Sequence, residues 1–322
     1  MKIEKEDFPK PGAGEVSIEV KAIGLNYADI FQVLGLYKAA PKTAFIPGLE
    51  FSGIVTDVGD GKSEFTIGDR VMGVTKFGAY VSHINIDANY LVSIPGEWTF
   101  QQGAAFPVQV LTAYYALRPL GNLQEGQTVL IQSAAGGVGL LANRIAKKFN
   151  AYTIGVVGTA DKVPLLQKER YDAGIIRSKD FKKDVLTALE GRELNLVLEA
   201  TGGKLLEDAL DLLAPSGRLI AYGSAQYTPS GNAPNYPLLL WKYLRRPRID
   251  PHAMISQNKS VMGFNLIFLY ERVHLMKEMM EEVMKLKLEP PLVSKIYEFD
   301  EIPQALTEFK SGKTFGKLIV NL

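Results

Sequence analysis

The hydrophobic pattern of the chain changes near residue 101. Before this point, short apolar segments are separated by glycine, aspartate and lysine turns. Residues 15–21 alternate polar and apolar positions, as a half-buried strand does. Residues 51–58 and 69–74 are further strand-like segments. Many short strands with glycine corners predict a small β-barrel domain.

Beyond residue 101, helical and strand-like patterns alternate. A helical stretch over residues 101–117 is interrupted near Pro107, and apolar runs typical of buried strands follow, with helical segments between them. This alternation predicts an α/β domain with a parallel sheet and crossover helices. The strand-like runs are residues 128–133, 152–157, 195–199 and 218–223.

The remainder of the chain mixes these patterns. Residues 225–260 are polar, proline-rich and basic, which predicts a loop whose Arg245–Arg248 cluster faces solvent. Residues 265–288 have the spacing of one helix, and its methionines at 276, 279, 280 and 284 are expected in the core. Strand, short helix and strand then follow at residues 292–299, 300–309 and 316–321.

Both ends of the chain are therefore expected to build the β-rich domain. The predicted boundaries are residues 1–103 with 288–322 for this domain and 104–287 for the parallel-sheet domain. A length of 322 residues agrees with two domains, because single cores stop growing at roughly 250–300 residues.

Composition narrows the chemistry. The chain has no cysteine, which excludes disulfides, thiolate catalysis and cysteine zinc sites, and its histidines are few and widely spaced, so we expect no metal. A net charge of +1 gives no case for nucleic acid or an anionic membrane. No apolar run approaches the roughly 20 residues that span a bilayer, and no signal-peptide core precedes residue 15. We therefore expect a cytoplasmic protein.

The strongest motif is the strand, small-residue turn and helix over residues 128–148. Ala134, Gly136 and Gly139 occupy the small-residue positions of a dinucleotide fingerprint, with Ala134 in place of the first glycine. Small residues let the backbone approach a pyrophosphate, and the helix N-terminus then meets the anion with free N–H groups. The residues expected to bind it are Ala135, Gly136, Gly137 and Val138.

The second predicted strand of this unit indicates which dinucleotide is used. An acidic residue at its end would select NAD by binding the ribose 2′-OH. The strand instead ends in Gly158-Thr159, and Lys162 follows; Arg177 and Ser178 come at the end of the next predicted strand. A neutral strand end with nearby cations favours a 2′-phosphate, although Asp161 weakens the argument, and we expect NADPH.

Together these segments resemble a known family, the zinc-free medium-chain dehydrogenases/reductases of the quinone oxidoreductase and polyketide synthase enoyl reductase branch. Zinc-dependent relatives carry a histidine where this chain has Leu49. The matching segments lie in the family's order along nearly the whole chain: residues 24–29, 47–55, 68–71, 133–139, 155–160 and 316–320.

The resemblance implies a GroES-like β-barrel catalytic domain, a Rossmann-type domain and NADPH between them, with hydride delivered to an activated C=C or a quinone. It suggests Tyr37 as a proton donor and places Asn26 and Asp29 in the active site; a structural role is an alternative for Tyr37 and Asp29. The further cofactor contacts that it implies are Thr112, Gly223, Phe264, Asn265, Leu266 and Lys317.

The substrate stays open at this point. The leading reading is an enoyl thioester, reduced simply or in a ring-closing variant that displaces a leaving group; the alternative is a free quinone or enone. A binding protein that holds NADPH without turnover is a third reading. The chain begins inside the family's first hairpin, which resembles a domain cut from a larger synthase, with an acyl carrier protein as partner; a naturally short start is the alternative. Residues 260–264 are a candidate dimer edge, and monomer or homodimer is expected.

Overall fold

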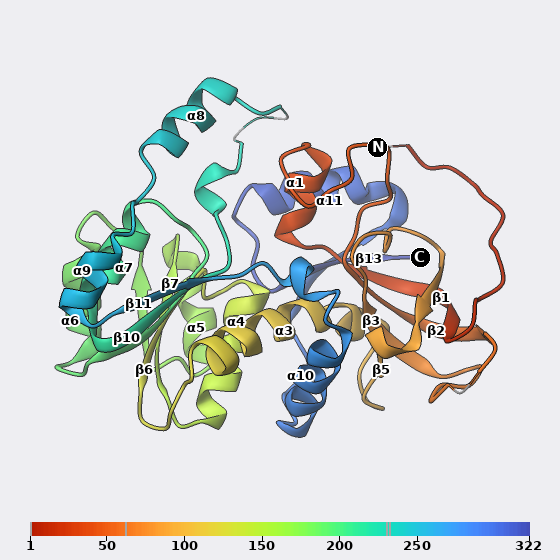
Figure 1. Cartoon of the computed structure of the whole chain (residues 1–322), viewed down its shortest axis with the longest axis horizontal. Helices are drawn as coiled ribbons and strands as arrows, with labels where there is room; N and C mark the ends of the chain where they lie inside the picture. Colours follow the sequence, from red (N-terminus) through yellow and green to blue (C-terminus); the bar gives the residue numbers. More distant parts are fainter. Residues whose placement is uncertain (1, 62, 230, 232) are drawn as a thin grey trace. The chain divides into compact units, whose positions relative to one another are not determined.

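The computed structural model describes residues 2–61, 63–229, 231 and 233–322. The chain forms two compact units (Figure 1). The first unit contains Met1–Gln109, Leu266–Glu282 and Glu289–Leu322, and the second contains Val110–Asn265 and Val283–Leu288. Residues 104–109 and 266–282 thus group with the β-rich unit, whereas the sequence placed them with the parallel sheet. The family domain boundaries stay a prediction.

The first unit is built on a seven-stranded sheet in the order β12-β13-β1-β2-β3-β5, with β4 paired to β1. All of its pairings are antiparallel except that of β12 with β13. The predicted strands at both ends of the chain are confirmed. The strands are β1 Glu15–Gly24, β2 Glu50–Val58, β3 Arg70–Val74, β4 His83–Asp87, β5 Leu91–Ser93, β12 Val293–Glu298 and β13 Lys317–Asn321.

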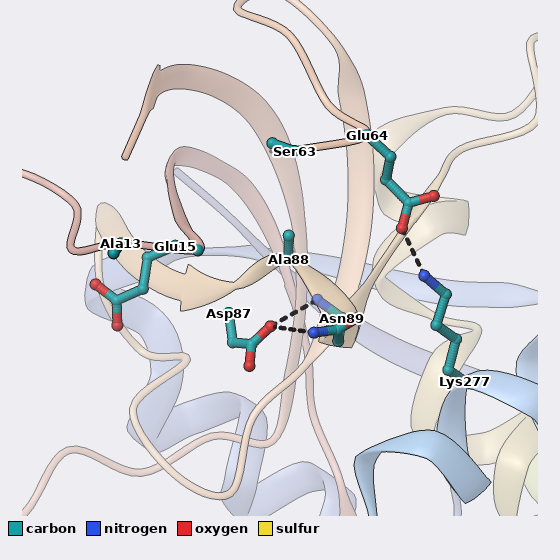
Figure 2. Close-up of a pocket in the computed structure, with 9 residues that line it drawn as sticks. Ala13, Glu15, Ser63, Glu64, Asp87, Ala88, Asn89 and Lys277 are labelled. Atoms are coloured by element: carbon teal, nitrogen blue, oxygen red, sulfur yellow. Dashed lines mark hydrogen bonds and ion pairs between the residues drawn. The ribbon is translucent and has the colours of Figure 1, made fainter. Parts of the chain in front are cut away.

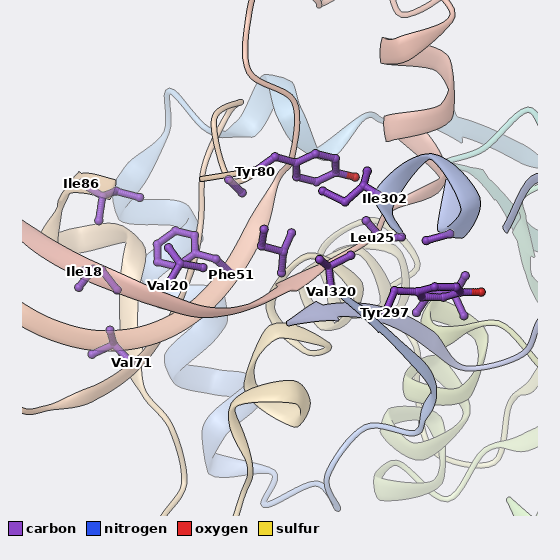
Figure 3. Close-up of a cluster of buried hydrophobic side chains, with 14 of the residues drawn as sticks. Ile18, Val20, Leu25, Phe51, Val71, Tyr80, Ile86, Tyr297, Ile302 and Val320 are labelled. Carbon is purple, nitrogen blue, oxygen red and sulfur yellow. The ribbon is translucent and has the colours of Figure 1, made fainter. Parts of the chain in front are cut away.

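Alternation along these strands sends one row of side chains into a single core (Figure 3). Ile18, Phe51 and Val71 come from three neighbouring strands and are fully buried. Helices complete the unit: α1 Tyr27–Val33, η1 Ala88–Tyr90, α2 Phe100–Ala104, η5 Leu266–Leu269, α10 Val273–Lys285 as far as Glu282, η6 Phe299–Glu301 and α11 Ile302–Lys310. The α3 helix, Pro107–Tyr115, begins in this unit and continues into the second.

The second unit is a six-stranded parallel sheet in the order β11-β10-β9-β6-β7-β8, as the alternating pattern predicted. The strand order reverses between β6 and β9, which are neighbours although β7, β8 and their connecting helices separate them in sequence. The candidate dimer edge at residues 260–264 lies largely on β11, which forms one end of the sheet, and its pairing with a second copy stays a prediction. The strands are β6 Thr128–Gln132, β7 Tyr152–Val157, β8 Ala173–Ile176, β9 Leu194–Glu199, β10 Leu213–Ala221 and β11 Ser260–Gly263.

Crossover helices pack their apolar faces against this sheet. Phe181 and Val185 of one helix, for example, are buried in the same core as Ile154. The helices of this unit are η2 Ala116–Leu120, α4 Gly137–Lys148, η3 Ala160–Lys162, α5 Val163–Lys168, α6 Phe181–Leu189, α7 Lys204–Leu212, η4 Ala225–Tyr227, α8 Tyr236–Leu244 and α9 Pro251–Gln257.

The predicted single helix over residues 265–288 is wrong. The η5 helix ends at Leu269, and α10 begins only at Val273. Between them, the Tyr90 hydroxyl donates to the Tyr270 carbonyl at 2.6 Å, and the two rings stack with centroids 4.0 Å apart. This contact takes a carbonyl that a continuous helix would direct at the amide four residues on. The methionine stripe is confirmed as core at Met276, Met279 and Met280; Met284 is half-buried.

The predicted loop over residues 225–260 is also wrong, since it contains α8 and α9. Proline lies in the first turn of both helices, where its missing N–H has no helical acceptor. Asn235 and Asp250 cap them by accepting from Leu238 N and His252 N. The prolines therefore mark helix starts. Along the described ranges, every helix is too short or too polar to traverse a bilayer.

A tight approach in the first sheet yields a stability prediction. A Cβ on Gly53 would lie 2.2 Å from the Glu19 carbonyl oxygen, so Gly53→Ala must displace backbone. We expect it to lower the free energy of unfolding by about 1–3 kcal/mol, the usual cost of overpacking, in urea denaturation. Gly96→Ala is the matched control, because a Cβ there meets nothing within 4 Å. Equal stability of the two variants would contradict the prediction.

Candidate functional site

The turn after β6 has the geometry that a dinucleotide fingerprint requires. Ser133 adopts a left-handed φ of 52°, and α4 starts at Gly137 with Gly136 as its N-cap. A Cβ on Gly139 would lie 2.7 Å from Ala134 Cα, so this position must be glycine for the helix to pack against the strand end. The strand, turn and helix predicted from sequence are confirmed.

Backbone amides at this turn are available to an anion. Gly136 N donates to Ser133 O, and Leu140 N donates to Gly136 O. Within the described residues, the intervening amides and that of Ala135 have no acceptor in the chain. The free amides belong to Ala135, Gly137, Val138 and Gly139. An α-helix N-terminus with free donors and a partial positive charge suits a pyrophosphate.

The ends of β7 and β8 carry the residues expected to bind a 2′-phosphate. Gly158 is exposed, and a Cβ there would meet nothing within 4 Å, so the space above this strand end is open. Lys162 is half-buried at the end of η3, and burial lowers the pKa of its ammonium while Asp161 opposes that shift. Arg177 and Ser178 follow β8, where the Ser178 hydroxyl donates to Asp184 at 2.5 Å. Two cations thus lie after neighbouring strands, and Thr159, directly after Gly158, is exposed.

Two polar side chains that the sequence reasoning missed meet where the strand order reverses. Gln132 ends β6 and Glu199 ends β9; Ile131 pairs with Leu198, so these residues form the next pair on the same face. Both are fully buried. Among the described residues, neither amide atom of Gln132 and only Oε1 of Glu199 has a hydrogen-bond partner. The sequence does contain a signal for these two residues, since each is a polar residue at the end of an otherwise apolar strand.

Burial raises the pKa of the Glu199 carboxyl, while hydrogen bonds from Gly202 N and Thr201 N oppose that shift. These amides donate to Glu199 Oε1 at 2.7 and 2.8 Å. The other carboxyl oxygen, Oε2, is buried and has no partner among the described residues. Unsatisfied buried polar groups are rare in folded proteins and call for a ligand or bound water. In open α/β sheets the crevice at such a reversal is the usual ligand position.

In the first unit, three expected site residues form one buried polar cluster. Lys317 and Glu50 are an ion pair, and both side chains have an exposed fraction of 0%. Lys317 Nζ also donates to Asn26 Oδ1 at 2.9 Å, and Asn26 Nδ2 donates to Glu50 Oε1 at 2.9 Å. Val108 N donates to the second oxygen of Glu50. The Asn26 amide is therefore fully oriented by the pair.

The resemblance implies that Lys317 contacts the cofactor, whereas the structure gives its ammonium partners within the protein. In the orientation that satisfies its amide, Gln109 accepts a further bond from Lys317 Nζ at 3.1 Å. The three donors of the ammonium then have three acceptors inside the first unit. A direct bond from Lys317 to a phosphate would require one of these bonds to break. The geometry instead supports a positioning role for Lys317.

Asp29 continues the cluster from the first turn of α1. Its Oδ2 accepts from Asn26 N and from the Tyr80 hydroxyl, each at 2.8 Å, and Oδ1 accepts from Gln32 Nε2 at 3.3 Å. Burial raises the pKa of Asp29 to about 7, and these hydrogen bonds oppose that shift only in part. Burial likewise raises the pKa of Tyr80. Tyr80 was not expected from the sequence, which offers no signal for it.

The remaining expected residues lie as follows. Tyr37 is half-buried in the loop after α1. Thr112 is buried on α3. A Cβ on Gly223 would lie 2.7 Å from the Ala200 carbonyl, so this strand end tolerates no side chain. Phe264 packs edge-on against Tyr115 with centroids 4.9 Å apart. Asn265 ends that segment of the second unit, and Leu266 begins η5 in the first.

A hollow of about 710 Å³ in the first unit is separate from these residues (Figure 2). Glu64 and Lys277 form an ion pair across part of it at 2.8 Å, and Asp87 accepts from Asn89. None of the expected site residues is in its lining, which consists of Ala13, Gly14, Glu15, Ser63, Glu64, Asp87, Ala88, Asn89 and Lys277. We assign the hollow no part in the site.

Two families match separate parts of the chain. Residues 12–96 match the alcohol dehydrogenase GroES-like domain, and residues 174–320 match a family described as zinc-binding dehydrogenase. In the part of the chain that the structure describes, no cluster of three or more histidine, aspartate or glutamate side chains could hold a metal ion.

Similar proteins include oxidoreductases and vesicle proteins. The chain is 29% identical to the Danio rerio synaptic vesicle membrane protein VAT-1 homolog, covering 98% of this chain but 66% of that protein. It is 30% identical to the Nematostella vectensis quinone oxidoreductase-like protein 2 homolog, covering 96% and 82%. It is also 30% identical to the highly reducing polyketide synthase lcsB of Purpureocillium lilacinum, covering 96% of this chain and 12% of the synthase.

Solved structures agree with the predicted fold class. The human synaptic vesicle membrane protein VAT-1 homolog-like protein superposes with a TM-score of 0.83 at 28% identity, covering 98% of this chain and 91% of that one. Escherichia coli quinone oxidoreductase complexed with NADPH gives 0.83 at 26%, covering 99% and 95%. CurK enoyl reductase gives 0.83 at 26%, covering 99% and 94%. A GroES-like domain with a Rossmann-type domain is confirmed.

The buried ion pair yields a prediction for stability. Lys317→Met leaves the Glu50 carboxylate buried without its counter-ion, and we expect the free energy of unfolding to fall by about 3–5 kcal/mol. The double variant Lys317→Met/Glu50→Gln removes both charges and should lose clearly less. Chemical denaturation of the wild type and both variants measures this. A double variant less stable than the single one would show that the pair is not the cause.

The raised pKa of Asp29 yields a pH prediction. The carboxyl ionises near its ordinary value of 3.8 in the unfolded chain and near 7 in the folded one, so between these values the folded state binds more protons. Stability contributed by Asp29 therefore falls as pH rises through this window and levels off above it. Relative to Asp29→Asn, the wild type should lose about 2–3 kcal/mol of unfolding free energy from pH 5 to pH 8. Parallel pH profiles of the two proteins would refute this.

Proposed function

The chain belongs to the medium-chain dehydrogenase/reductase family, and we propose that it is an NADPH-dependent, zinc-independent reductase that reduces an activated carbon–carbon double bond. The observation that carries the proposal is the turn after β6, with its free amides at Ala135, Gly137, Val138 and Gly139. A donor array of this kind at the carboxyl end of a parallel sheet suits a dinucleotide pyrophosphate. The oxidoreductase relatives support it.

Residues of the second unit fit the other parts of NADPH. The open space above Gly158 leaves room for the adenosine ribose, and Lys162 and Arg177 provide positive charge for a 2′-phosphate. Thr159 and Ser178 add hydroxyl groups at the same two strand ends. The unpaired groups of Gln132 and Glu199 mark a polar crevice at the strand reversal. The Escherichia coli relative, whose structure is a complex with NADPH, supports this choice of cofactor.

The nicotinamide end is assigned to a separate set of residues. NADPH supplies a hydride when bound, and the protein orients it and excludes water. Thr112, Gly223 and Asn265 are the proposed contacts, with Phe264 and Leu266 as apolar walls. The bare backbone at Gly223 allows close approach, because no side chain projects from that strand end.

Hydride addition to the β-carbon of an enone or enoyl thioester builds negative charge on the carbonyl oxygen, and the α-carbon must then receive a proton. We assign the proton donor to the Tyr37 hydroxyl. Asn26 and Asp29 use their side chains within the buried cluster, so their proposed contribution is to hold the segment before and within α1 in place. Lys317 acts in the same way, through Asn26.

The proposed substrate is an enoyl thioester. The likeness to CurK enoyl reductase and to the polyketide synthase supports it. A carrier-bound substrate and a place within a larger synthase are part of the proposal, and so is a ring-closing variant in which hydride addition expels a leaving group. The second candidate is a free quinone, which the quinone oxidoreductase relatives support. Both candidates use the same cofactor site.

A side-by-side assay tests the proposal. NADPH oxidation is followed by absorbance with an enoyl thioester and with a quinone, using the wild type and Tyr37→Phe, and NADH serves as the cofactor control. We expect the thioester to turn over faster, NADPH to be preferred, and Tyr37→Phe to slow thioester reduction by about 10²–10⁴-fold, the usual contribution of general acid catalysis.

Other outcomes point elsewhere. Faster quinone turnover that is indifferent to Tyr37 would establish the second candidate. Thioester turnover that survives Tyr37→Phe would remove Tyr37 as the proton donor or indicate the ring-closing variant, which the released leaving group identifies. NADPH binding without turnover of either substrate would reduce the protein to a binding role.

A further inference from the structure

The segment between α5 and β8 contacts both α4 and the turn that precedes it. Glu169 forms a two-pronged ion pair with Arg144 of α4, with both N···O distances 2.8 Å, and its carbonyl accepts from Asn143 at 2.6 Å. Two residues later, the ring of Tyr171 is buried with an exposed fraction of 8%. The segment is therefore fixed to the first helix of the nucleotide-binding unit.

The Tyr171 hydroxyl reaches both ends of the turn. Its single proton is shared between the Gly139 carbonyl oxygen at 2.7 Å and the Ala134 carbonyl oxygen at 3.1 Å. Ala134 is the first residue of the fingerprint and Gly139 the last, so one hydroxyl links the strand end to the first turn of α4. Burial raises the pKa of this phenol well above its ordinary value, so the group stays a donor at every physiological pH.

A glycine makes room for this ring. A Cβ on Gly155 of β7 would lie 2.9 Å from Tyr171 Cδ1 and 3.0 Å from the Ala134 methyl group. Gly155 thus leaves the space through which the ring passes beneath the turn. The structure thus provides both the space for the Tyr171 ring and two carbonyl acceptors for its hydroxyl. A phenylalanine at this position would fill the same space without the hydrogen bonds.

The geometry of the peptide group links this contact to cofactor binding. In a planar trans peptide, the C=O and the N–H of the following residue point in opposite directions. A hydroxyl that holds the Ala134 carbonyl toward Tyr171 therefore holds the Ala135 N–H away from Tyr171. Within the described residues, the Ala135 amide has no acceptor in the chain.

We propose that Tyr171 is a positioning residue of the nucleotide turn, whose hydroxyl orients the Ala135 N–H toward the cofactor pyrophosphate. This inference rests on the proposed function, since it takes the turn to bind a dinucleotide. Tyr171 itself does not contact the cofactor; it acts through the backbone of residues 134–139.

The test compares Tyr171→Phe with Tyr152→Phe. Tyr152 of β7 is a matched control in the same unit, because its hydroxyl donates to the Ala188 carbonyl at 3.3 Å, away from the turn. Titration calorimetry measures the dissociation constants of NADPH and of adenosine 2′-monophosphate, which has the 2′-phosphate but no pyrophosphate. We expect Tyr171→Phe to weaken NADPH binding about five- to tenfold, in line with the net contribution of a hydrogen bond to a partly charged site.

Three further results complete the expectation. Tyr152→Phe should leave NADPH binding unchanged, and Tyr171→Phe should leave binding of adenosine 2′-monophosphate unchanged, because that probe does not reach the turn. Without ligand, hydrogen exchange at residues 134–139 should be faster in Tyr171→Phe than in the wild type. A general loss of structure would not spare the smaller probe.

The inference is overturned if Tyr171→Phe binds NADPH within twofold of the wild type, or if both probes weaken equally. The exchange measurement needs no cofactor and separates the two proposals. If the wild type binds no dinucleotide, the proposed function fails; faster exchange of the turn in Tyr171→Phe would still support its positioning role, and unchanged exchange would end it.

Discussion

The first unit depends on one ion pair that water does not reach. Lys317 and Glu50 are both completely buried, and removing such charges from water is costly unless every donor and acceptor finds a partner. The partners come from Asn26, directly before α1, and from the Val108 amide and Gln109, which are neighbours in the first turn of α3. The pair thereby ties the last strand, β13, to β2 and to the segment that leads into α1. Asp29 and Tyr80 extend the same network.

The second unit presents backbone amides in place of charged side chains. Amides can face a ligand only where neighbouring side chains are small, which explains Gly136 and Gly139 at the turn. Backbone alone is also flexible, and the structure restrains it from the far side through Tyr171, Glu169 and α4. Gly155 leaves the space for that restraint. The turn itself therefore consists of small residues, and the side chains of Glu169 and Tyr171 hold its backbone in place.

The buried polar groups of Gln132 and Glu199 that have no partner among the described residues lower the stability of the folded protein. A buried polar group without a partner costs about 1–3 kcal/mol, and both residues carry such groups at the ends of strands that are otherwise apolar. Departures of this kind are expected at functional positions. Their place at the strand reversal agrees with the proposed cofactor site.

The sequence by itself determined several strands of both units, a parallel sheet with crossover helices and the turn from Ala134 to Gly139, because these depend on local periodicity and on residues too small to have a substitute. The order of the strands, with β9 beside β6, came only from the tertiary structure. The local pattern wrongly predicted one continuous helix through η5 and α10, because the contact that interrupts it joins Tyr90 and Tyr270, which are 180 residues apart in the chain. It also mistook the prolines of α8 and α9 for loop signals. Only the tertiary structure decided that Lys317 points into the core at Glu50, that Gln132 stands beside Glu199, and that Tyr171 supports the turn. Each of these pairs joins residues far apart in the chain. The free-energy cost of burying a charge or a polar group depends on whether the fold places a partner beside it, which the sequence pattern does not show.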